Sequence, residues 1–562
     1  MKINSFILSL EEVAAKNLSL NDIVTDIANL ICDRAADTRN FGIILVPEGL
    51  IEFIGEVNIL IQEINEILAT QANKPTLVSE LIDFVAQHLT EQSAKLLKFL
   101  PISISEQLLL DRDPHGNVQV AKIETEKLLI MLLQVELEKR KKEGKYQGEF
   151  TPQSHYFGYE GRCAFPSTFD CDYCYCLGLN AAALVDSGYT GMMSVVRNVG
   201  SPSEQWVPGG CPLVSMMNVE RRKGKDVPVI KKALVELDGP LFKLFEQERK
   251  GWREHDYYRS PGPIQFEFPL PAPYLACPPT KEQLYDHTKK EYVEESKPYA
   301  RIFPLSNISD LAFARAKDRP RIPAYLRNNS YNVILSSLLD YHSQETKHFA
   351  TTDYKYLTSQ PNNMRLIEVT EKAKTEKSTQ YTSLKKKENP LRIGIVFCGR
   401  QTPGVHNIVV GLQEFARGNN GEVLGFIGGT KGFFNKEYIK VTDESLEYYI
   451  NQGGMHFLGR SADKIRTPTE LEATLKCCQE LKLDGIVLVG ATHTLTDAII
   501  VTNYLLEHDC KTSVIGVPAS VDGNVYHHML EGIVGFDSAS KLYSQLIGNI
   551  MIDAASATKY WY

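Results

Sequence analysis

The stretch Arg392–Leu412, RIGIVFCGRQTPGVHNIVVGL, decides the fold of the second half of the chain. Its apolar start, Ile393–Phe397, is typical of a buried strand, and the loop with Gly399, Pro403 and Gly404 precedes an apolar run of helical spacing. A strand that turns into a helix leaves unpaired backbone N–H groups at the helix N-terminus, and these favour an anion. We expect Pro403 in the first helical turn. An ordinary strand-to-helix connection is the alternative, because neither GxGxxG nor GxxxxGK[ST] occurs here.

Composition places the chain among ordinary globular proteins. Its 562 residues, 43% hydrophobic and 23% charged, correspond to roughly three to four domains. The net charge of −8 argues against a nucleic-acid surface. No apolar run approaches the roughly 18 residues that span a bilayer, and the apolar start at Phe6–Leu10 is too short for a signal peptide. Eleven cysteines, an odd number, fit a reducing cytosol, so we expect a cytoplasmic protein.

The cysteine cluster Cys171-x-x-Cys174-x-Cys176 raises the question of a metal site. A structural zinc site needs four ligands, usually with a second pair nearby. Only two further candidate ligands lie close in the sequence, and the segment Phe169–Leu179 is also typical of the start of a packed helix. We therefore favour the helix.

The first part of the chain alternates helical and strand-like patterns. Helical spacing predicts a helix over Leu20–Ala36, and the continuous apolar run Phe41–Val46 predicts a buried parallel strand. Glu48 directly follows that strand, where ligands bind in open α/β sheets. It is a candidate ligand group or, alternatively, an acid at a helix N-terminus. A long helix is predicted over residues 120–144, since its last turn is rich in lysine and arginine.

The segment His155–Arg162, HYFGYEGR, is a glycine-punctuated turn with aromatic residues and an arginine. Arginine binds phosphate through two parallel hydrogen bonds, and tyrosine can hydrogen-bond a sugar, so Arg162 and Tyr159 are candidate binding residues. The alternative is that Arg162 is a surface charge and Tyr159 a packed ring. A turn and a strand are predicted over Gly188–Val199.

Between residues 256 and 390 the pattern becomes irregular. Pro261–Pro279 is too rich in proline for a helix or a sheet, and the lysines at 385–387 are typical of a solvated linker. Residues 391–562 return to alternating patterns that predict a parallel, doubly wound sheet. The predicted strands after Ile393–Phe397 are Val423–Ile427, Gly485–Val489 and Ser513–Val517, and the predicted helices include Pro468–Leu481 and Thr496–His508.

Several long motifs resemble those of the diphosphate-dependent 6-phosphofructokinases. They are VPEGLIEFIGEV (46–57), HYFGYEGRCAFPSTFDCDYCYCLG (155–178), IGIVFCGRQTPGVHN (393–407), NQGGMHFLGRSADKIRT (451–467) and VIGVPASVDGNVYHHMLEGIVGFD (514–537). The resemblance implies an α/β fold of phosphofructokinase-type, Rossmann-like doubly wound sheets, with two half-units joined by an irregular linker. Residues 1–255 resemble the C-terminal, sugar-phosphate part of a beta-like unit. Residues 391–562 resemble the N-terminal, phosphate-donor part of an alpha-like unit, and residues 256–390 link the two.

The order of these motifs differs from that of the family. In the family the phosphate loop precedes the PEGLIE and YEGR stretches, whereas here it follows them. We expect a fragment of a tandem protein, with the C-terminal part of one unit joined to the N-terminal part of the next. A circular permutant is the alternative, and the tandem arrangement is favoured over it because a permutant would need to contain the family's MGR motif.

The resemblance implies phosphorylation of fructose 6-phosphate to fructose 1,6-bisphosphate, with diphosphate as donor and Mg²⁺ as cofactor. The substrate-binding residues of the family correspond to Glu48 and to Tyr159 and Arg162, with Glu160 and Gly161 between them. The family's catalytic base corresponds to Asp522, which follows Ser520, and its diphosphate loop corresponds to Gly399 and Arg400. The implied partners are the two substrates and other phosphofructokinase units in an oligomer, with no nucleic acid or membrane.

The same half departs from the family at functional positions. Arg400 stands where the family has a second glycine, Thr492 where it has the Mg²⁺-binding carboxylate, and Ala519 where it has a diphosphate-contacting lysine. Asp497 lies five residues after Thr492, but helical spacing takes it away from the loop. The alternatives to an enzyme are therefore a non-catalytic regulatory or ligand-binding subunit, allosteric in role, and an inactive gene fragment. We expect the isolated chain to have little or no activity.

Overall fold

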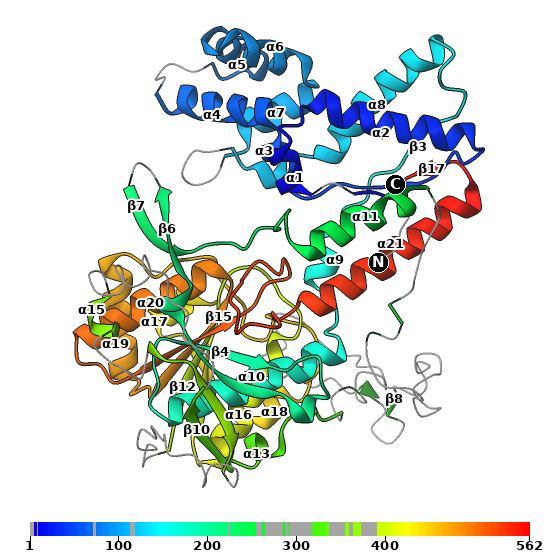
Figure 1. The fold of residues 1–562 in the computed structure, drawn as a ribbon. Coiled ribbons are helices and arrows are strands. Elements are labelled where there is room, and N and C mark those ends of the chain that lie inside the picture. The colour runs from blue at the N-terminus through cyan, green and yellow to red at the C-terminus, as the bar shows by residue number, and fades with distance from the viewer. Residues whose placement is uncertain are drawn as a thin grey trace. The chain divides into compact units, whose positions relative to one another are not determined.

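The computed structural model describes residues 5–7, 9–70, 75–112, 118–222, 225–254, 261–262, 264, 285–286, 291–292, 315, 318–336, 354–358, 364–372 and 390–562. The chain forms two compact units (Figure 1). The first comprises Met1–Tyr156, Leu234–Ser260 and Ser544–Tyr562, and the second comprises Phe157–Ala233 and Pro261–Tyr543. The predicted ranges 1–255, 256–390 and 391–562 describe which parts of the family's units the chain resembles, not which residues pack together, so they stay a prediction.

The first unit is mainly helical. The predicted helix is confirmed as α2 (Leu20–Ala36), which begins with a capping box between Ser19 and Asp22. The predicted strand is shorter, β2 (Ile43–Leu45), and it pairs in parallel with β1 (Ser5–Ile7). The long helix is also shorter than predicted, because a 3₁₀ turn at Val120–Lys122 precedes α8 (Thr125–Lys142).

Six further helices in the described part of this unit pack around one apolar core, which also buries Trp561. They are α1 (Leu10–Ala15), α3 (Leu50–Phe53), α4 (Gly55–Thr70), α5 (Val78–His88), α6 (Glu91–Phe99) and α7 (Ile102–Leu110). The unit also contains α11 (Pro240–Glu254). A short parallel pair joins β3 (Thr151–Pro152) and β17 (Tyr560–Trp561).

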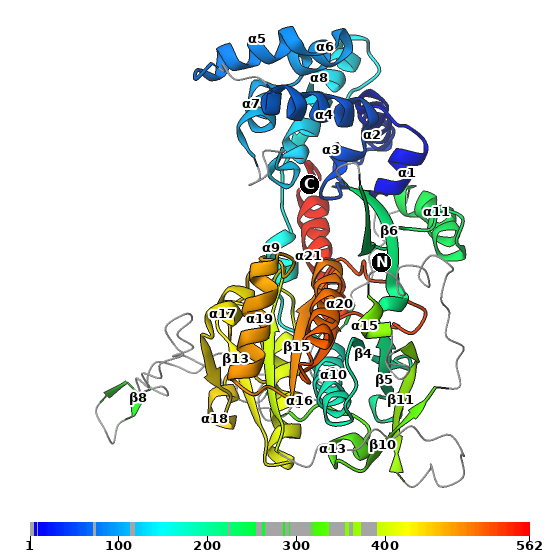
Figure 2. The same ribbon diagram turned by 90° about the vertical axis from the view of Figure 1, so that its left-hand side faces the viewer.

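A nine-stranded sheet organises the second unit, in the order β10-β11-β5-β4-β16-β15-β12-β13-β14 (Figure 2). The five central strands are parallel, as predicted: β4 (Met192–Arg197), β16 (Ser513–Pro518), β15 (Gly485–Gly490), β12 (Arg392–Phe397) and β13 (Glu422–Phe426). The edges are antiparallel, and they consist of β14 (Tyr438–Lys440), β5 (Val207–Pro212), β11 (Ile367–Glu371) and β10 (Tyr331–Leu335).

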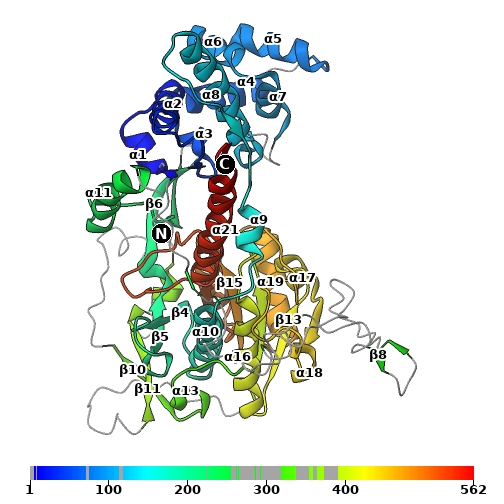
Figure 3. The same ribbon diagram turned by 90° about the vertical axis from the view of Figure 1, so that its right-hand side faces the viewer.

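Helices cover both faces of this sheet, so it is doubly wound. Alternate side chains of each central strand enter different cores: Ile393 and Ile395 enter the core beside α10 (Thr168–Asp186) and α16 (Val405–Gly418), whereas Val396 enters the other. The second face carries α19 (Pro468–Glu480) and α20 (Thr492–Glu507). α10 and α16 lie side by side (Figure 3). Gly178 makes this approach possible, since a Cβ there would lie 2.2 Å from the Ile408 carbonyl oxygen.

Shorter elements complete the second unit and α21 (Phe536–Ala557) begins in it. They are α9 (Gly158–Arg162), α13 (Ala324–Arg327), α15 (Lys355–Thr358), α17 (Thr430–Asn435), α18 (Asp443–Leu446), 3₁₀ turns at Ser203–Gln205 and Leu213–Met216, the hairpin β6 (Met217–Arg222) with β7 (Lys225–Ile230), and the pair β8 (Tyr285–Asp286) with β9 (Glu291–Tyr292). No helix in the described part of the chain has the length and apolarity needed to cross a membrane.

The structure tests three local expectations, and the outcome differs from one to the next. The helix after β12 begins at Val405 with Gly404 as its N-cap in the left-handed conformation, so the placement of Pro403 in the first turn was wrong. The predicted packed helix start is confirmed in α10, where the cluster thiols are buried. Within the range 256–390, β10 and β11 join the large sheet, while most of the proline-rich stretch and the lysines at 385–387 lie outside the described residues.

Candidate anion site at the carboxyl edge of the sheet

Three loops meet where neighbouring parallel strands end. β16, β15 and β12 are adjacent in the sheet, and their carboxyl ends lead into residues 519–522, 491–492 and 398–404. The Cys398 N–H donates to the Val489 carbonyl at 2.9 Å, and the Ala519 N–H donates to the Gly490 carbonyl at 3.0 Å. Since parallel strands present their carboxyl ends to the same edge, this is where an open α/β sheet binds ligands.

The loop after β12 is held against the segment 453–461. The Gly399 N–H donates to the Ser461 carbonyl at 2.9 Å, and the Gly404 N–H donates to the Gly453 carbonyl at 2.9 Å. Two N–H groups of the kind expected to face an anion are therefore already bound to protein.

Arginines supply the positive charge at this edge of the sheet. Arg460 donates from Nη1 to the Gly399 carbonyl at 2.6 Å. Burial lowers the pKa of the Arg460 guanidinium, and the positive charges of Arg162 and Arg400 lower it further. Arg162 and Arg400 are thus close enough to act on the charge of Arg460, and we call Arg162, Arg400 and Arg460 the arginine cluster. Such a cluster is stabilised by an anionic ligand, since guanidinium groups bind phosphate oxygens through paired hydrogen bonds.

α9 carries the first member of the cluster. The Arg162 guanidinium lies 5.4 Å from the centre of the Tyr159 ring, and 67% of Tyr159 is exposed. The alternative of Tyr159 as a packed ring is therefore wrong. Gly161 packs against Tyr543, where a Cβ would lie 2.2 Å from the ring, so a larger residue would displace α9. Glu160 is half-buried in the same turn.

The loop after β16 carries Ser520 and Asp522. Ser520 is buried. Its hydroxyl accepts the Asp522 N–H at 3.2 Å and donates to Asn524 Oδ1 at 3.1 Å. This turn leaves Asp522 exposed. Ala519, at the family's lysine position, is buried and bridges to Val534.

The residues present do not fit Mg²⁺. Thr492 is the first residue of α20, is 3% exposed and has no carboxylate. Asp497 lies within α20, where its carboxylate binds Arg466 Nε at 2.6 Å and the Ile465 N–H at 3.2 Å. Over the described ranges, no group of three or more histidine, cysteine, aspartate or glutamate side chains could hold a metal ion. We derive no step through Mg²⁺.

Glu48 lies in the first unit, whereas the other candidate residues lie in the second. It is exposed, and it stands two residues before α3, whose N-cap is Gly49 in the left-handed conformation. The structure therefore brings together Arg162, Arg400 and Gly399, and it leaves the relation of Glu48 to them a prediction.

Arg460 was missed by the sequence reasoning, although a signal was present. Each member of the arginine cluster directly follows a glycine, in the segments EGR (160–162), CGR (398–400) and LGR (458–460). Glycine permits the tight turns that bring backbone close to a bound phosphate. The repeated Gly-Arg pair was a reason to add Arg460 to the candidates.

Parts of the chain are similar to known proteins. Residues 392–561 match the family described as Phosphofructokinase. A pyrophosphate–fructose 6-phosphate 1-phosphotransferase subunit beta from Ricinus communis is 54% identical over 262 residues, which are 46% of this chain and 46% of that protein. A pyrophosphate–fructose 6-phosphate 1-phosphotransferase from Treponema pallidum (strain Nichols) is 47% identical over 266 residues, again 46% of each chain.

The chain spans about half the length of these curated relatives. A solved phosphofructokinase from Saccharomyces cerevisiae aligns with a TM-score of 0.28 and 18% identity, over 30% of this chain and 22% of that one. The α/β fold class rests on the sheet described above. The matched segment, residues 392–561, is thus similar to the family described as Phosphofructokinase, and about half of the chain is similar to the two relatives.

Proposed function

We propose that the chain carries part of the site of a diphosphate-dependent phosphotransferase that phosphorylates fructose 6-phosphate at its 1-position. The observation that carries the proposal is the arginine cluster at the carboxyl edge of the sheet, beside Gly399. Three neighbouring cations match a diphosphate better than a neutral or singly charged ligand. The names of the relatives supply the substrates.

The reaction assigns a role to each candidate residue. The phosphoryl group passes from diphosphate to the 1-hydroxyl of the sugar, the proton of that hydroxyl passes to Asp522, and inorganic phosphate leaves. Arg400 and Arg460 hold the donor and offset the negative charge of the transferring group. Arg162 and Tyr159 hold the sugar phosphate. The role of Asp522 rests on resemblance alone.

A non-catalytic, ligand-binding subunit is the second candidate function. The chemistry of two residues favours this function. Thr492 and Ala519 are both buried and uncharged, and they stand where the family has its metal carboxylate and its lysine. The arginine cluster could then bind an effector such as a sugar bisphosphate. The name of the Ricinus relative includes a subunit designation, and we propose that this chain also associates with other phosphofructokinase units.

The order of the motifs supports two arrangements of the gene, a tandem protein and a circular permutant. What favours the permutant is the sheet, in which β4 from the first part of the chain pairs with β16 from the second, at Ile515 with Met192. The coding sequence on either side of these 562 residues tests the two. MGR-containing segments on both sides are expected of a tandem protein.

Two measurements on the 562-residue chain separate the candidate functions. The first is isothermal titration with inorganic diphosphate, and the second is turnover of fructose 6-phosphate with diphosphate or with ATP. We expect diphosphate binding with little or no turnover. Turnover with ATP only would contradict the donor, and an absence of binding to diphosphate would contradict the site.

A further inference from the structure

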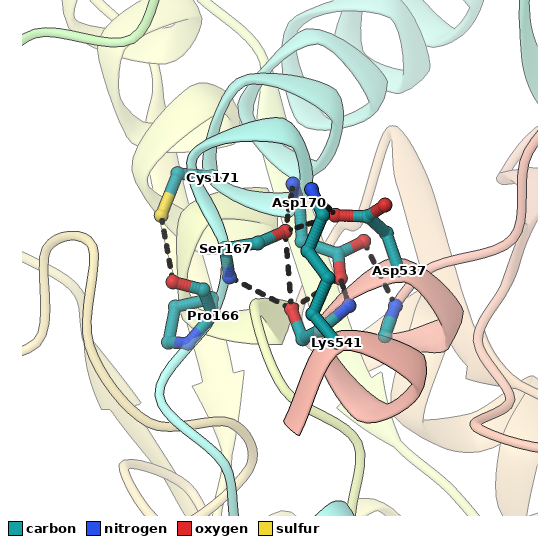
Figure 4. Close-up of polar contacts among 8 residues, drawn as sticks. Pro166, Ser167, Asp170, Cys171, Asp537 and Lys541 are labelled. Atoms are coloured by element: carbon teal, nitrogen blue, oxygen red, sulfur yellow. Dashed lines mark hydrogen bonds and ion pairs between the residues drawn. The ribbon is translucent and has the colours of Figure 1, made fainter. Parts of the chain in front are cut away.

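Asp170 is a fully buried carboxylate that no step of the proposed function uses. It lies in the first turn of α10. Its Oδ1 accepts the Gly535 N–H at 3.0 Å, and its Oδ2 accepts both the Ser538 N–H at 2.9 Å and the Ser538 hydroxyl (Figure 4). Asp170 therefore caps the start of α21 from a neighbouring helix.

The same junction is closed from the other side. Ser167 donates its hydroxyl to Asp537 at 2.6 Å, and its N–H donates to the Ser538 hydroxyl at 2.8 Å. Lys541 forms an ion pair with Asp537 at 2.6 Å (Figure 4). The first turns of α10 and α21 thus exchange hydrogen bonds, and each presents an acid to the other's N-terminus, which fixes the two helix starts together.

This junction touches the end of the loop that follows β12. Gly535 has a φ of +85°, and a Cβ there would lie 2.4 Å from Thr402 Cγ2 and 3.0 Å from Pro403 Cδ. A Cβ at Gly404 would lie 3.4 Å from Asp170 Cβ. The residues that Asp170 binds and the backbone beside Asp170 are therefore in contact with residues 402–404.

The junction also reaches the loop that carries Asp522. Val534 directly precedes Gly535 and bridges to Ala519. Its carbonyl accepts the Ser520 N–H at 3.1 Å, and its own N–H donates to the Pro518 carbonyl at 3.3 Å. Fixing Gly535 therefore fixes the strand-like contact from which the turn at Ser520–Asp522 begins.

We infer that Asp170 is a positioning residue, whose carboxylate holds the start of α21 and thereby sets the loop 399–404 and the loop 519–522 relative to each other. The inference rests on the proposed function in that these loops are taken to hold and use diphosphate. Burial raises the pKa of Asp170 to about 6 even though the Ser538 and Gly535 donors lower it. Burial of a carboxylate is unfavourable, and the donors of Gly535 and Ser538 that Asp170 holds in place explain why it is buried here.

The test compares Asp170→Asn with Asp172→Asn. Asp172 lies two residues on in α10, is 8% exposed and accepts the Arg321 N–H at 2.9 Å, away from both loops. An asparagine at 170 has one side-chain acceptor, so at least one donor of α21 loses its partner. Hydrogen–deuterium exchange is followed in the two loops, and affinity for inorganic diphosphate is measured by titration.

We expect Asp170→Asn to raise amide exchange in both loops and to weaken diphosphate binding, each by about tenfold or more, while Asp172→Asn changes neither. Ser538→Ala removes the hydroxyl that donates to Asp170 and accepts the Ser167 N–H, but it keeps the backbone N–H bonds from Gly535 and Ser538 to Asp170. It should change the same loops by a smaller factor, so it decides the question if Asp170→Asn does not fold. Unchanged exchange in the folded variant overturns the inference. A wild-type chain that binds no diphosphate overturns the proposed function, and the exchange comparison then still judges Asp170.

Discussion

Replacing Arg460 by glutamine should weaken anion binding without loosening the fold. Arg460 is the member of the arginine cluster that bonds the phosphate loop directly, from Nη1 to the Gly399 carbonyl at 2.6 Å. Burial lowers the pKa of Arg460, and the positive charges of Arg162 and Arg400 lower it further, so each of the two repels Arg460. Glutamine removes the charge and, because its side chain is shorter than that of arginine, weakens the bond to the Gly399 carbonyl.

The magnitude follows from the two states of the site. In the complex, loss of one charged hydrogen bond to the anion costs about 1.5–3 kcal/mol, which is about a 10- to 150-fold rise in Kd. In the free protein, the weakened bond to Gly399 costs about 1 kcal/mol or less, and relief of repulsion from the other two guanidinium groups offsets part of it. The free energy of unfolding should therefore change by less than about 1 kcal/mol.

The assay is titration of inorganic diphosphate at two salt concentrations, with urea unfolding in parallel. Arg417→Gln is the matched control, because it makes the same change in net charge at an exposed ion pair with Asp443. Its affinity should stay within about twofold of wild type, since exposed pairs contribute at most about 1 kcal/mol. If Arg460→Gln binds diphosphate like the control, or loses several kcal/mol of stability, the assignment of Arg460 to the anion site is refuted.

Three further predictions concern Asp497, Glu12 in the first unit, and the uncharged residues at positions 492 and 519. Asp497→Asn should destabilise the chain by about 3 kcal/mol in urea unfolding, because it leaves Arg466 without its buried partner, and Mg²⁺ affinity should not change; a loss of Mg²⁺ affinity at unchanged stability would make Asp497 a ligand. The two hydrogen bonds from Arg249, at 2.6 and 2.7 Å, hold the pKa of Glu12 at about 2 instead of 4.5. Its stabilisation of up to about 3 kcal/mol is present above pH 4.5 and lost as the pH falls towards 2, so thermal unfolding should show this dependence in wild type and lack it in Glu12→Gln. Thr492→Asp combined with Ala519→Lys should make diphosphate binding stronger in Mg²⁺ than without it, and equal affinities with and without Mg²⁺ in a folded double variant would argue against the ancestral donor site.

Local sequence was sufficient for the centre of the large sheet. Strands such as β12 and β15 are continuous apolar runs bounded by glycine, which is the pattern of a strand buried on both faces. The edge strands β10 and β11 were not predicted. Their buried residues alternate with half-buried ones inside a polar region, so no apolar run marks them. Their place in the sheet depends on pairing with β5, more than a hundred residues away in sequence.

One part of the candidate site could likewise be predicted from local sequence, and another part could not. The glycine and arginine of the loop after β12 could be identified locally, as could Tyr159 and Arg162 in α9. The fate of the loop's N–H groups could not, because their acceptors are carbonyls of Ser461 and Gly453 in a distant segment. The same segment brings Arg460 to Gly399. A loop predicted to bind an anion through backbone donors is, in the structure, a loop flanked by arginines.

The central claim is that the arginine cluster binds a diphosphate at an edge of the sheet that lacks a metal carboxylate. Titration of inorganic diphosphate into the 562-residue chain, with Mg²⁺ and with a chelator, tests it most directly. One binding site of similar affinity under both conditions is predicted, and Arg460→Gln should weaken it. No binding, or binding that strictly requires Mg²⁺, would contradict the account.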